Sequence, residues 1–383
     1  MTIETLGNVC TQVRASVRPG ERPDLRYVGL ESIESGSGQF VEGHLSKTPE
    51  VPLANSFHFD SSHVLYGKLR PYLNKVALPN FEGKCSTEII PLLPKVNLDR
   101  EYLAYFLRSS RVVDLISART AGARMPRADM DYIFSLLIPV PPLSEQRRIV
   151  DLLSRAEGIV RLRRDAEKKA AELIPALFID MFGDPAMNPK GWSVDSLGDV
   201  LDSADYGCSS KASDDADGMP MIRMGNVSYA GNLDLTDLKY IVLPADQVER
   251  YHLKDGDILF NRTNSKDLVG KTGLWKGTID AIAASYFIRL RVRSEVVSPD
   301  YVWAFMNSGY MKRKIFSTAR GAIGQSNINS KELRAFALPI PPLPLQRQFA
   351  QRCDDIAALV AQEASASTKA QATFDALLSR TFG

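Results

Sequence analysis

The stretch Ile-Pro-Val-Pro-Pro-Leu-Ser-Glu-Gln-Arg-Arg-Ile at residues 138–149 decides the fold, because the chain carries it twice. Residues 338–349 read Leu-Pro-Ile-Pro-Pro-Leu-Pro-Leu-Gln-Arg-Gln-Phe, at an offset of 200 residues. The match continues downstream to Phe182-Gly183 in the first copy and Phe382-Gly383 in the second. A match this long at one offset indicates an internal two-fold repeat, with units of about 1–183 and 184–383.

A long helical pattern follows each Pro-Pro-Leu. Proline forbids helix just before this point, so we expect helices over residues 143–183 and 343–383. The apolar residues of the first pattern follow a three-four spacing: Leu152, Ala156, Ile159, Ala166, Ala170, Leu173 and Leu177. The matching residues of the second pattern are Ile356, Leu359, Ala366, Ala370 and Leu377.

Two such alanine-rich stripes suit two helices packed closely along their length. A single stripe fits equally well a helix that lies on its own domain. Because the chain has two, we expect the helices to pair as an antiparallel or otherwise arranged coiled coil of roughly 57 Å. Pro175 lies inside the first pattern and should kink that helix or end it early.

The rest of each repeat, residues 1–142 and 184–342, reads as a globular domain of mixed helix and strand. Short β-type runs such as Val64-Leu-Tyr66 and Asp257-Ile-Leu-Phe260 are broken by Gly, Pro, Asn and Asp. One amphipathic helix is predicted in each domain, over 101–117 and 300–317, with N-caps at Asp99 and Ser298. The expected class is α+β.

The composition is that of an ordinary globular protein. The 383 residues include 47 Lys and Arg, 45 Asp and Glu and only 4 Cys, and the formal net charge of +2 excludes a polycationic nucleic-acid coat. The cysteines form no C-x-x-C pair, and no segment is apolar for long enough to span a membrane. We therefore expect a protein of the reducing cytoplasm.

No catalytic signature is present in the sequence. There is no G-x-G-x-x-G, and Gly270-Lys271-Thr272 resembles the tail of a phosphate-binding loop whose first glycine is replaced by Ser265. The clustered histidines lack helical metal-ligand spacing; they are His44, His58 and His63. We expect no catalytic, cofactor or metal site in this chain.

Polar residues suited to DNA gather at matching places of the two copies. In the first copy these are Lys68, Arg70, Lys75 and Arg124, and in the second they are Arg262, Lys271, Gln325 and Asn327. Arg, Gln and Asn make bidentate contacts to guanine and adenine edges, whereas Lys suits phosphates. Taken singly, each is a solvated surface group, but two diverged copies with such residues at matching positions favour DNA reading.

Together these motifs closely resemble the specificity subunit of type I restriction-modification systems, over the whole chain. The most specific segments are Pro-Pro-Leu-Ser-Glu-Gln-Arg at 141–147, Gly-Asp-Ile-Leu-Phe at 256–260 and Gly-Ala-Ile-Gly-Gln-Ser-Asn at 321–327. Leu345 departs from the pattern, since the family has Glu there, and this departure concerns only the helix start in the second copy.

The resemblance implies a non-catalytic DNA reader. Each variable domain is then a target recognition domain for one half of a split, asymmetric site, and the two helices form an antiparallel coiled coil that sets the spacing. The implied partners are double-stranded DNA, two methyltransferase subunits and further restriction subunits. S-adenosylmethionine, ATP and Mg²⁺ are expected on those partner subunits, and no cofactor on this chain.

This hypothesis gives the site residues two roles. Phosphates are neutralised by Lys68, Arg70, Lys75, Arg262 and Lys271, and base edges are reached by Arg124, Gln325 and Asn327. Two other hypotheses remain: a coiled-coil scaffold that binds only proteins, and a free-standing methyltransferase, against which the missing cofactor loop argues. A steep loss of affinity with salt would favour DNA.

Overall fold

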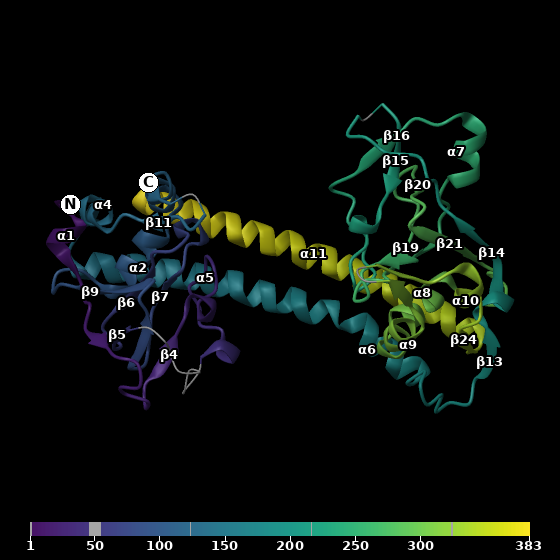
Figure 1. Ribbon diagram of the computed structural model, residues 1–383, viewed down its shortest axis with the longest axis horizontal. Coiled ribbons are helices and arrows are strands. Elements are labelled where there is room, and N and C mark those ends of the chain that lie inside the picture. The colour runs from purple at the N-terminus through teal and green to yellow at the C-terminus, as the bar shows by residue number, and fades with distance from the viewer. Residues whose placement is uncertain (1, 46–54, 123, 216, 323–324) are drawn as a thin grey trace. The chain divides into compact units, whose positions relative to one another are not determined.

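The chain divides into two compact units. The computed structural model describes residues 2–45, 55–122, 124–215, 217–322 and 325–383. Unit 1 comprises Met1–Ala166 and Glu363–Gly383, and unit 2 comprises Glu167–Gln362 (Figure 1). Each unit therefore contains one globular domain, the first part of the long helix that follows that domain, and the last part of the other long helix.

Two four-stranded sheets form the domain of unit 1. One is antiparallel, in the order β2-β9-β6-β7: Cys10–Gln12, Ile89–Pro94, Val64–Gly67 and Val76–Ala77. The other, with one parallel pair, has the order β3-β5-β8-β4: Ser16–Val17, Ser56–Phe59, Gly83–Ser86 and Arg26–Val28. Strand β6 is buried on both faces, because Val64 and Tyr66 belong to one apolar core and Leu65 to another.

Unit 2 repeats this plan. Its antiparallel sheet has the order β14-β21-β17-β19: Leu201–Tyr206, Phe287–Val292, Ile258–Asn261 and Thr272–Leu274. A second sheet has the order β16-β15-β20: Lys239–Ile241, Met219–Ile222 and Ile282–Ala283. Strand β17 alternates between two cores as β6 does, with Ile258 and Phe260 in one and Leu259 in the other. The β-runs predicted around these two central strands are confirmed.

The helix predicted in each domain is two helices. In unit 1 these are α2 (Arg100–Arg108) and α3 (Ser110–Ser117), and in unit 2 they are α8 (Pro299–Asn307) and α9 (Gly309–Thr318). The continuous helix was wrong because Ser109 and Ser308 adopt extended backbone angles that end the first helix of each pair.

The two predicted N-caps had different outcomes. The side chain of Asp99 accepts the N–H groups of Glu101 and Tyr102, so the cap of α2 is confirmed. Ser298 is the N-cap residue of α8, as predicted, but its side chain makes no capping hydrogen bond to the helix.

A two-stranded ribbon precedes each long helix. In unit 1, β1 (Thr2–Thr5) pairs with β12 (Leu137–Val140), and in unit 2, β13 (Ser193–Ser196) pairs with β24 (Ala337–Ile340). A fully buried glutamine then ties the start of each helix to its domain. Gln146 Oε1 accepts the Asp99 N–H at 2.8 Å, and its amide nitrogen donates to the Pro141 carbonyl at 2.8 Å. Gln346 repeats these bonds with Ser298 and Pro341, at 2.8 and 2.7 Å.

The long helices are α5 (Leu143–Ala171), α6 (Leu173–Phe182) and α11 (Leu343–Phe382). The first pattern is interrupted at Glu172, as Pro175 predicted, because proline has no N–H to donate to the carbonyl four residues earlier, at Ala171. Among the described residues, no helix combines the length and the apolarity needed to cross a bilayer.

The predicted apolar stripe was partly wrong about which face of each long helix is buried. Leu152 and Ile159 are 47% and 54% exposed, whereas the next residues along α5, Leu153 and Val160, are buried. On α11 the buried side chains include two aromatic ones that the stripe left out, Phe349 and Phe374, as well as Cys353 and Leu378. The stripe followed only small and aliphatic residues shared by both copies, so it missed the aromatic residues that face the domains.

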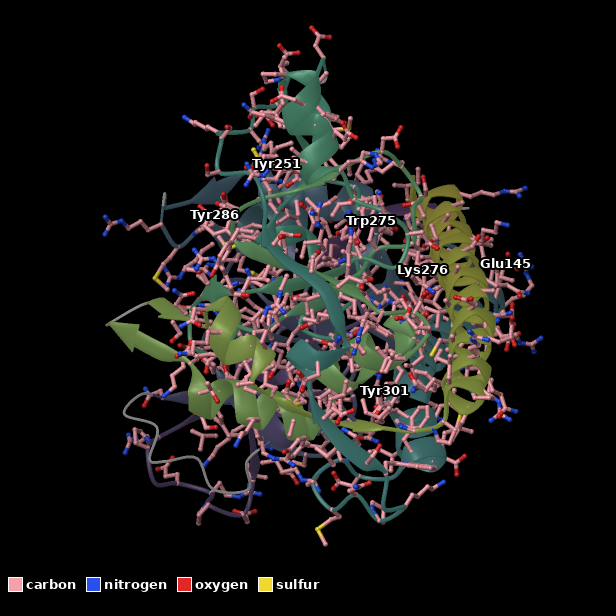
Figure 2. All side chains as sticks on the ribbon, turned by 90° about the vertical axis from the view of Figure 1, so that its right-hand side faces the viewer. Glu145, Tyr251, Trp275, Lys276, Tyr286 and Tyr301 are labelled. Carbon is pink, nitrogen blue, oxygen red and sulfur yellow. The ribbon has the colours of Figure 1, made fainter. Side chains whose placement is uncertain are left out.

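Each domain packs against the last turns of the helix from the other repeat. In unit 1, the Phe382 ring of α11 lies 5.1 Å from the Tyr102 ring of α2. In unit 2, the Phe182 ring of α6 lies 4.8 Å from the Tyr301 ring of α8, which Figure 2 labels inside the unit. The domain of unit 2 also contacts the helix that follows it, because Lys276 Nζ pairs with Asp354 of α11 at 3.1 Å. Both domains are thus fixed to helix ends by equivalent aromatic contacts.

Candidate nucleic-acid interface

A small β-hairpin lies beside the end of the central strand in each unit. In unit 1 it is formed by β10 (Thr120–Ala121) and β11 (Arg127–Ala128), and in unit 2 by β22 (Arg320–Ala322) and β23 (Gln325–Asn327). The Ala128 N–H donates to the Lys68 carbonyl at 2.8 Å, and the Ile328 N–H donates to the Arg262 carbonyl at 2.9 Å. Lys68 and Arg262 therefore occupy equivalent positions, between a central strand and its hairpin.

The loop that follows each of these two residues runs along the hairpin. In unit 1, the Arg70 N–H donates to the Pro126 carbonyl at 2.7 Å. In unit 2, β18 (Thr263–Asn264) pairs with β23. These contacts bring six of the predicted site residues to the hairpins: Lys68, Arg70 and Arg124 in unit 1, and Arg262, Gln325 and Asn327 in unit 2.

The charge of Lys68 is partly compensated. Its amino nitrogen lies 4.0 Å from a carboxylate oxygen of Glu88. Arg127 binds the same carboxylate with two of its nitrogens, at 2.9 and 3.1 Å. Glu88 thus offsets part of the charge of two cations, and Arg127 joins the cations of this hairpin without having been among the predicted contacts.

Arg70 and Arg124 present free guanidinium groups. Both residues are exposed, and neither side chain has a hydrogen bond or ion pair to another residue that the structure describes. Arg70 has a φ of 52°, in the left-handed region that non-glycine residues rarely adopt. Backbone strain of this kind concentrates at functional sites.

Lys75 and Lys271 do not face solvent at the hairpins. Lys75 Nζ donates to the Leu30 carbonyl at 2.6 Å, and Lys271 Nζ donates to the Met224 carbonyl at 2.5 Å. Burial lowers the pKa of both amino groups, and Lys271 is only 8% exposed. Each lysine is therefore placed to hold the short helix that contains its acceptor carbonyl, and this placement argues against the predicted phosphate contacts.

Arg262 is the most constrained of the predicted cations. Its Nε donates to the Ser285 carbonyl at 3.2 Å and its Nη1 to Asn327 Oδ1 at 3.3 Å. The guanidinium carbon lies 4.8 Å from the centre of the Tyr206 ring. Asn327 Oδ1 also accepts from Thr263 Oγ1 at 3.2 Å, so this oxygen is already occupied. The Gln325 side chain lies outside the described residues.

The prediction missed Tyr206, which is 45% exposed. It lies on β14, whose neighbour β21 pairs in turn with β17, the strand that leads to Arg262. Only this strand order brings Tyr206 to the hairpin, since no local pattern links it to Arg262. Tyr286 was also missed as a surface residue; it is 44% exposed, and its carbonyl accepts the Arg262 N–H at 2.9 Å.

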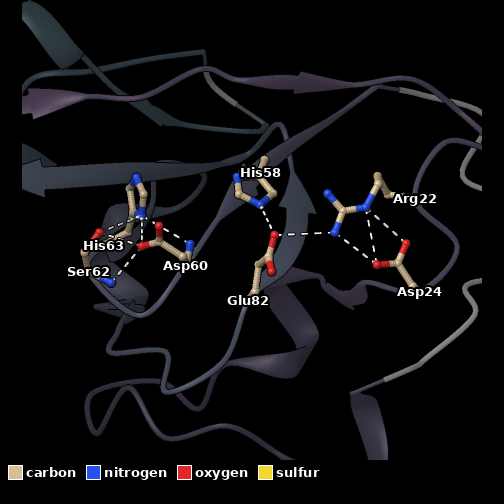
Figure 3. A network of polar contacts seen from close by, with 7 residues as sticks. All are labelled: Arg22, Asp24, His58, Asp60, Ser62, His63 and Glu82. Carbon is tan, nitrogen blue, oxygen red and sulfur yellow. Dashed lines mark hydrogen bonds and ion pairs between the residues drawn. The ribbon is translucent and has the colours of Figure 1, made fainter.

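Two of the histidines of unit 1, His58 and His63, lie beside carboxylates (Figure 3). His58 Nε2 lies 2.8 Å from Glu82, which also pairs with Arg22. His63 Nδ1 lies 2.9 Å from Asp60, whose pKa is lowered to about 2, chiefly by the hydrogen bond from Ser62. Within the described ranges, no three His, Cys, Asp or Glu side chains form a group that could hold a metal.

Known proteins with similar sequences are specificity subunits. The chain is 27% identical over 284 residues to the type I restriction enzyme EcoKI specificity subunit of Escherichia coli strain K12, an alignment that covers 69% of this chain and 60% of that protein. It is 24% identical over 314 residues to the StySPI specificity subunit of Salmonella potsdam, covering 76% and 66%. The matched part is less than two thirds of either relative.

Solved structures share the fold. A chain from a structure that describes the complex assembly and conformational transition of the type I restriction-modification system aligns with a TM-score of 0.63 at 23% identity, over all of this chain and 97% of that one. The S subunit of a type I restriction-modification system from M. genitalium aligns with a TM-score of 0.59 at 12% identity, over all of this chain and 96% of that one.

A family model matches both repeats. It describes the type I restriction modification DNA specificity domain, and it matches residues 46–172 and 189–368. The two matches lie one in each repeat and together cover most of the sequence. This chain therefore belongs to the family of type I restriction-modification DNA specificity domains.

Proposed function

We propose that this chain is the DNA sequence-recognition subunit of a type I restriction-modification complex. Each domain reads one half of a bipartite, asymmetric DNA site. The contacts are made at its hairpin and the adjoining loop, by Arg70 and Arg124 in unit 1 and by Arg262 and Gln325, with Asn327 beside them, in unit 2. The chain acts in the cytoplasm and performs no catalysis itself.

The observation that carries this proposal is the pair of equivalent hairpins with different side chains. The backbone bonds at Lys68 and Arg262 are the same, but Lys68 is paired with a carboxylate and Arg262 is held by neutral groups. Arginine, asparagine and glutamine read base edges, and the grooves present different edges for different bases. Two such surfaces that differ in chemistry suit two half-sites that differ in sequence.

The long helices would set the distance between the half-sites. Their pairing is supported within unit 1, where Arg163 Nη1 lies 2.8 Å from Glu363 Oε2 and Arg164 Nη2 donates to Gln371 at 2.8 Å. An antiparallel direction is supported there because α5 begins and α11 ends against the same domain, at Gln146 and Phe382. Helix α11 has 40 residues, a length of about 60 Å, which exceeds the roughly 34 Å between major-groove sites one helical turn apart.

The partners follow from this role. Two methyltransferase subunits would dock on the helices, and restriction subunits would complete the nuclease. S-adenosylmethionine, ATP and Mg²⁺ would be bound by those subunits, and adenine methylation would occur there. The domains proposed for these roles are residues 1–142 and 184–342 for the two readers, and 143–183 and 343–383 for the helices.

The test is to produce the full chain together with the methyltransferase subunits and to map the methylated adenines in exposed DNA. We expect one bipartite motif with two unlike halves. Methylation that is no different without this chain would contradict the proposal.

Binding gives a second measurement. The affinity of the complex for a duplex that carries the motif should fall steeply with salt, because phosphate contacts release counterions. A scaffold that binds only proteins would show no retention of DNA at low salt. The two outcomes separate the DNA reader from the protein-binding scaffold.

A further inference from the structure

Arg262 is held in one orientation by neutral groups only. The Ser285 carbonyl and Asn327 Oδ1 each accept one of its donors, and the guanidinium lies over the Tyr206 ring. Tyr206 is itself fixed, because its hydroxyl oxygen accepts the Ser330 N–H at 3.4 Å. Among the described residues no carboxylate pairs with Arg262, so its positive charge is not offset by a neighbour.

The arrangement leaves part of the guanidinium free. Arginine has five N–H donors in a planar fork. Two of them are used, at Nε and at Nη1, so the second Nη1 hydrogen and both Nη2 hydrogens have no partner among the described residues. Arg262 is partly exposed, and the three unused donors on its two terminal nitrogens are therefore available to a ligand with two acceptors.

The surroundings place this fork at an outer edge of unit 2. The carbonyl of Tyr286 accepts the Arg262 N–H, and Figure 2 shows Tyr286 on the side of the unit away from helix α11. Central strand β17 and hairpin β22–β23 both fix the backbone of Arg262 or its neighbours. A reader on strands is positioned more accurately than one on a free loop.

We propose that Arg262 reads a guanine in the half-site recognised by unit 2, and that Asn327 and Tyr206 are positioning residues for it. This inference rests on the proposed DNA-reading function and reverses two of the sequence-based roles, since Arg262 was expected at a phosphate and Asn327 at a base. Guanine offers two acceptors, O6 and N7, in the major groove, and they match the free end of a fixed arginine fork.

A phosphate role is a weaker fit to the same contacts. A phosphate contact needs charge but no fixed plane, and a flexible lysine serves as well. Stacking on Tyr206 and bonding to Asn327 restrict the plane of the guanidinium, which matters for a bidentate base contact and little for a point charge.

The test uses the full chain in complex with its methyltransferase subunits and a pool of randomised duplex DNA. The wild-type complex should select a bipartite consensus; if it selects none, the proposed function itself fails. Arg262→Lys keeps the charge and loses the fork. We expect the consensus to lose preference for one guanine in one half, with affinity for the wild-type consensus about tenfold to a hundredfold lower.

The remaining outcomes decide against the proposal. An unchanged consensus with Arg262→Lys would overturn it, and so would a uniform loss of affinity across all sequences. Arg223→Lys is the matched control, because Arg223 is a partly exposed arginine of the same unit that is paired with Asp237. It should leave the consensus unchanged.

Asn327→Ala covers the case in which Arg262→Lys does not fold. Asn327 is exposed, so the unit should tolerate its loss. If Asn327 only positions Arg262, preference for the same guanine weakens and no other position changes. Loss of an adenine preference, with the guanine preference intact, would make Asn327 the reader and overturn the assignment. Tyr206→Leu should weaken the same guanine, and a change at any other base would contradict a positioning role.

Discussion

The two units share several buried polar contacts and differ at their hairpins and at one contact between domain and helix. The Tyr102 hydroxyl donates to the Pro139 carbonyl at 3.0 Å, and the Tyr301 hydroxyl donates to the Pro339 carbonyl at 2.7 Å. The glutamines that follow each ribbon, and the lysines that donate to Leu30 and Met224, are repeated in the same way. Buried polar groups must be satisfied, so a duplicated backbone keeps these side chains.

The hairpins have diverged. Unit 1 has Lys68 and Arg127 around Glu88, where unit 2 has Arg262 between Tyr206 and Asn327. A carboxylate beside the cations weakens attraction to phosphates and to guanine acceptors, whereas an aromatic face does not. The same backbone thus carries two different sets of polar side chains.

The ion pairs that join each domain to a long helix have diverged as well. In unit 1 the buried Arg108 pairs with Glu157 of α5, which also accepts the Tyr105 hydroxyl at 2.9 Å. In unit 2 Lys276 pairs with Asp300 at 2.7 Å and with Asp354 of α11 at 3.1 Å. Arg108 is buried and Glu157 is 23% exposed, whereas Lys276 and Asp354 are 45% and 57% exposed.

The largest expected effect is on the free energy of unfolding, and it differs between the Arg108–Glu157 pair and the Lys276–Asp354 pair. Glu157→Ala leaves the buried Arg108 without its carboxylate and should lower the free energy of unfolding of unit 1 by about 4 kcal/mol. The helix-side partner in unit 2 is solvated, so Asp354→Ala should cost less than about 1 kcal/mol. Urea unfolding of both variants measures this difference. Equal losses would mean that burial does not distinguish the two ion pairs.

The glutamines give a somewhat smaller effect. Gln146→Ala removes bonds to Asp99, Asn97 and Pro141 and leaves buried backbone groups unpaired, at a cost of about 3 kcal/mol. Gln346→Ala removes two such bonds and should cost about 2 kcal/mol. The exposed Gln348→Ala is the control and should change stability by less than about 0.5 kcal/mol. If all three variants unfold at the same urea concentration, the buried bonds contribute nothing.

Much of the fold could be predicted from local sequence. The repeated Pro-Pro-Leu segment set the starts of α5 and α11, and Pro175 predicted the interruption at Glu172. The break between α2 and α3 was missed because serine is compatible with a helix interior, and the extended angles at Ser109 depend on tertiary packing. Which face of α5 is buried also depended on contacts with the domain.

From the sequence, the candidate site could be predicted only for residues whose exposure follows from their place in the chain. Arg70 and Arg124 were predicted as surface residues and both are exposed, since polar runs next to strands are visible in sequence. Their contact with DNA stays a prediction. The inward placement of the two lysines could not be predicted, because their acceptors lie 45 and 47 residues earlier in the chain, at Leu30 and Met224. Side-chain direction at such distances is set by topology, which no local pattern records.

The two lysines offer a direct test of this distinction. Lys75→Met and Lys271→Met should each lower stability by about 1 kcal/mol, because one hydrogen bond to a backbone carbonyl is lost in each unit. The dependence of DNA affinity on salt should stay unchanged for both. A decrease of the logarithmic salt slope by about 0.9 for either variant would restore that lysine as a phosphate contact.

The smallest expected change in stability has the opposite sign and lies in unit 1. Arg70→Gly removes an exposed guanidinium. It also removes the strain of a non-glycine residue in the left-handed region. The left-handed conformation costs roughly 1–2 kcal/mol and glycine adds roughly 0.5–1 kcal/mol of chain freedom to the unfolded state, so stability should rise by about 0.5 kcal/mol. A purely structural Arg70 would leave DNA affinity unchanged, but a phosphate contact predicts a salt slope lower by about 0.9.

Arg22 supplies the matched control for this last variant. It is the other arginine of unit 1 with a positive φ, at 49°, and its guanidinium is already paired with Asp24 and Glu82 (Figure 3). Arg22→Gly should therefore leave the salt slope at its wild-type value. If both variants lower the slope equally, the effect is general to exposed arginines, and the strained backbone at Arg70 marks no special contact. If only Arg70→Gly lowers it while the protein becomes more stable, the strain at Arg70 is maintained for binding and not for folding.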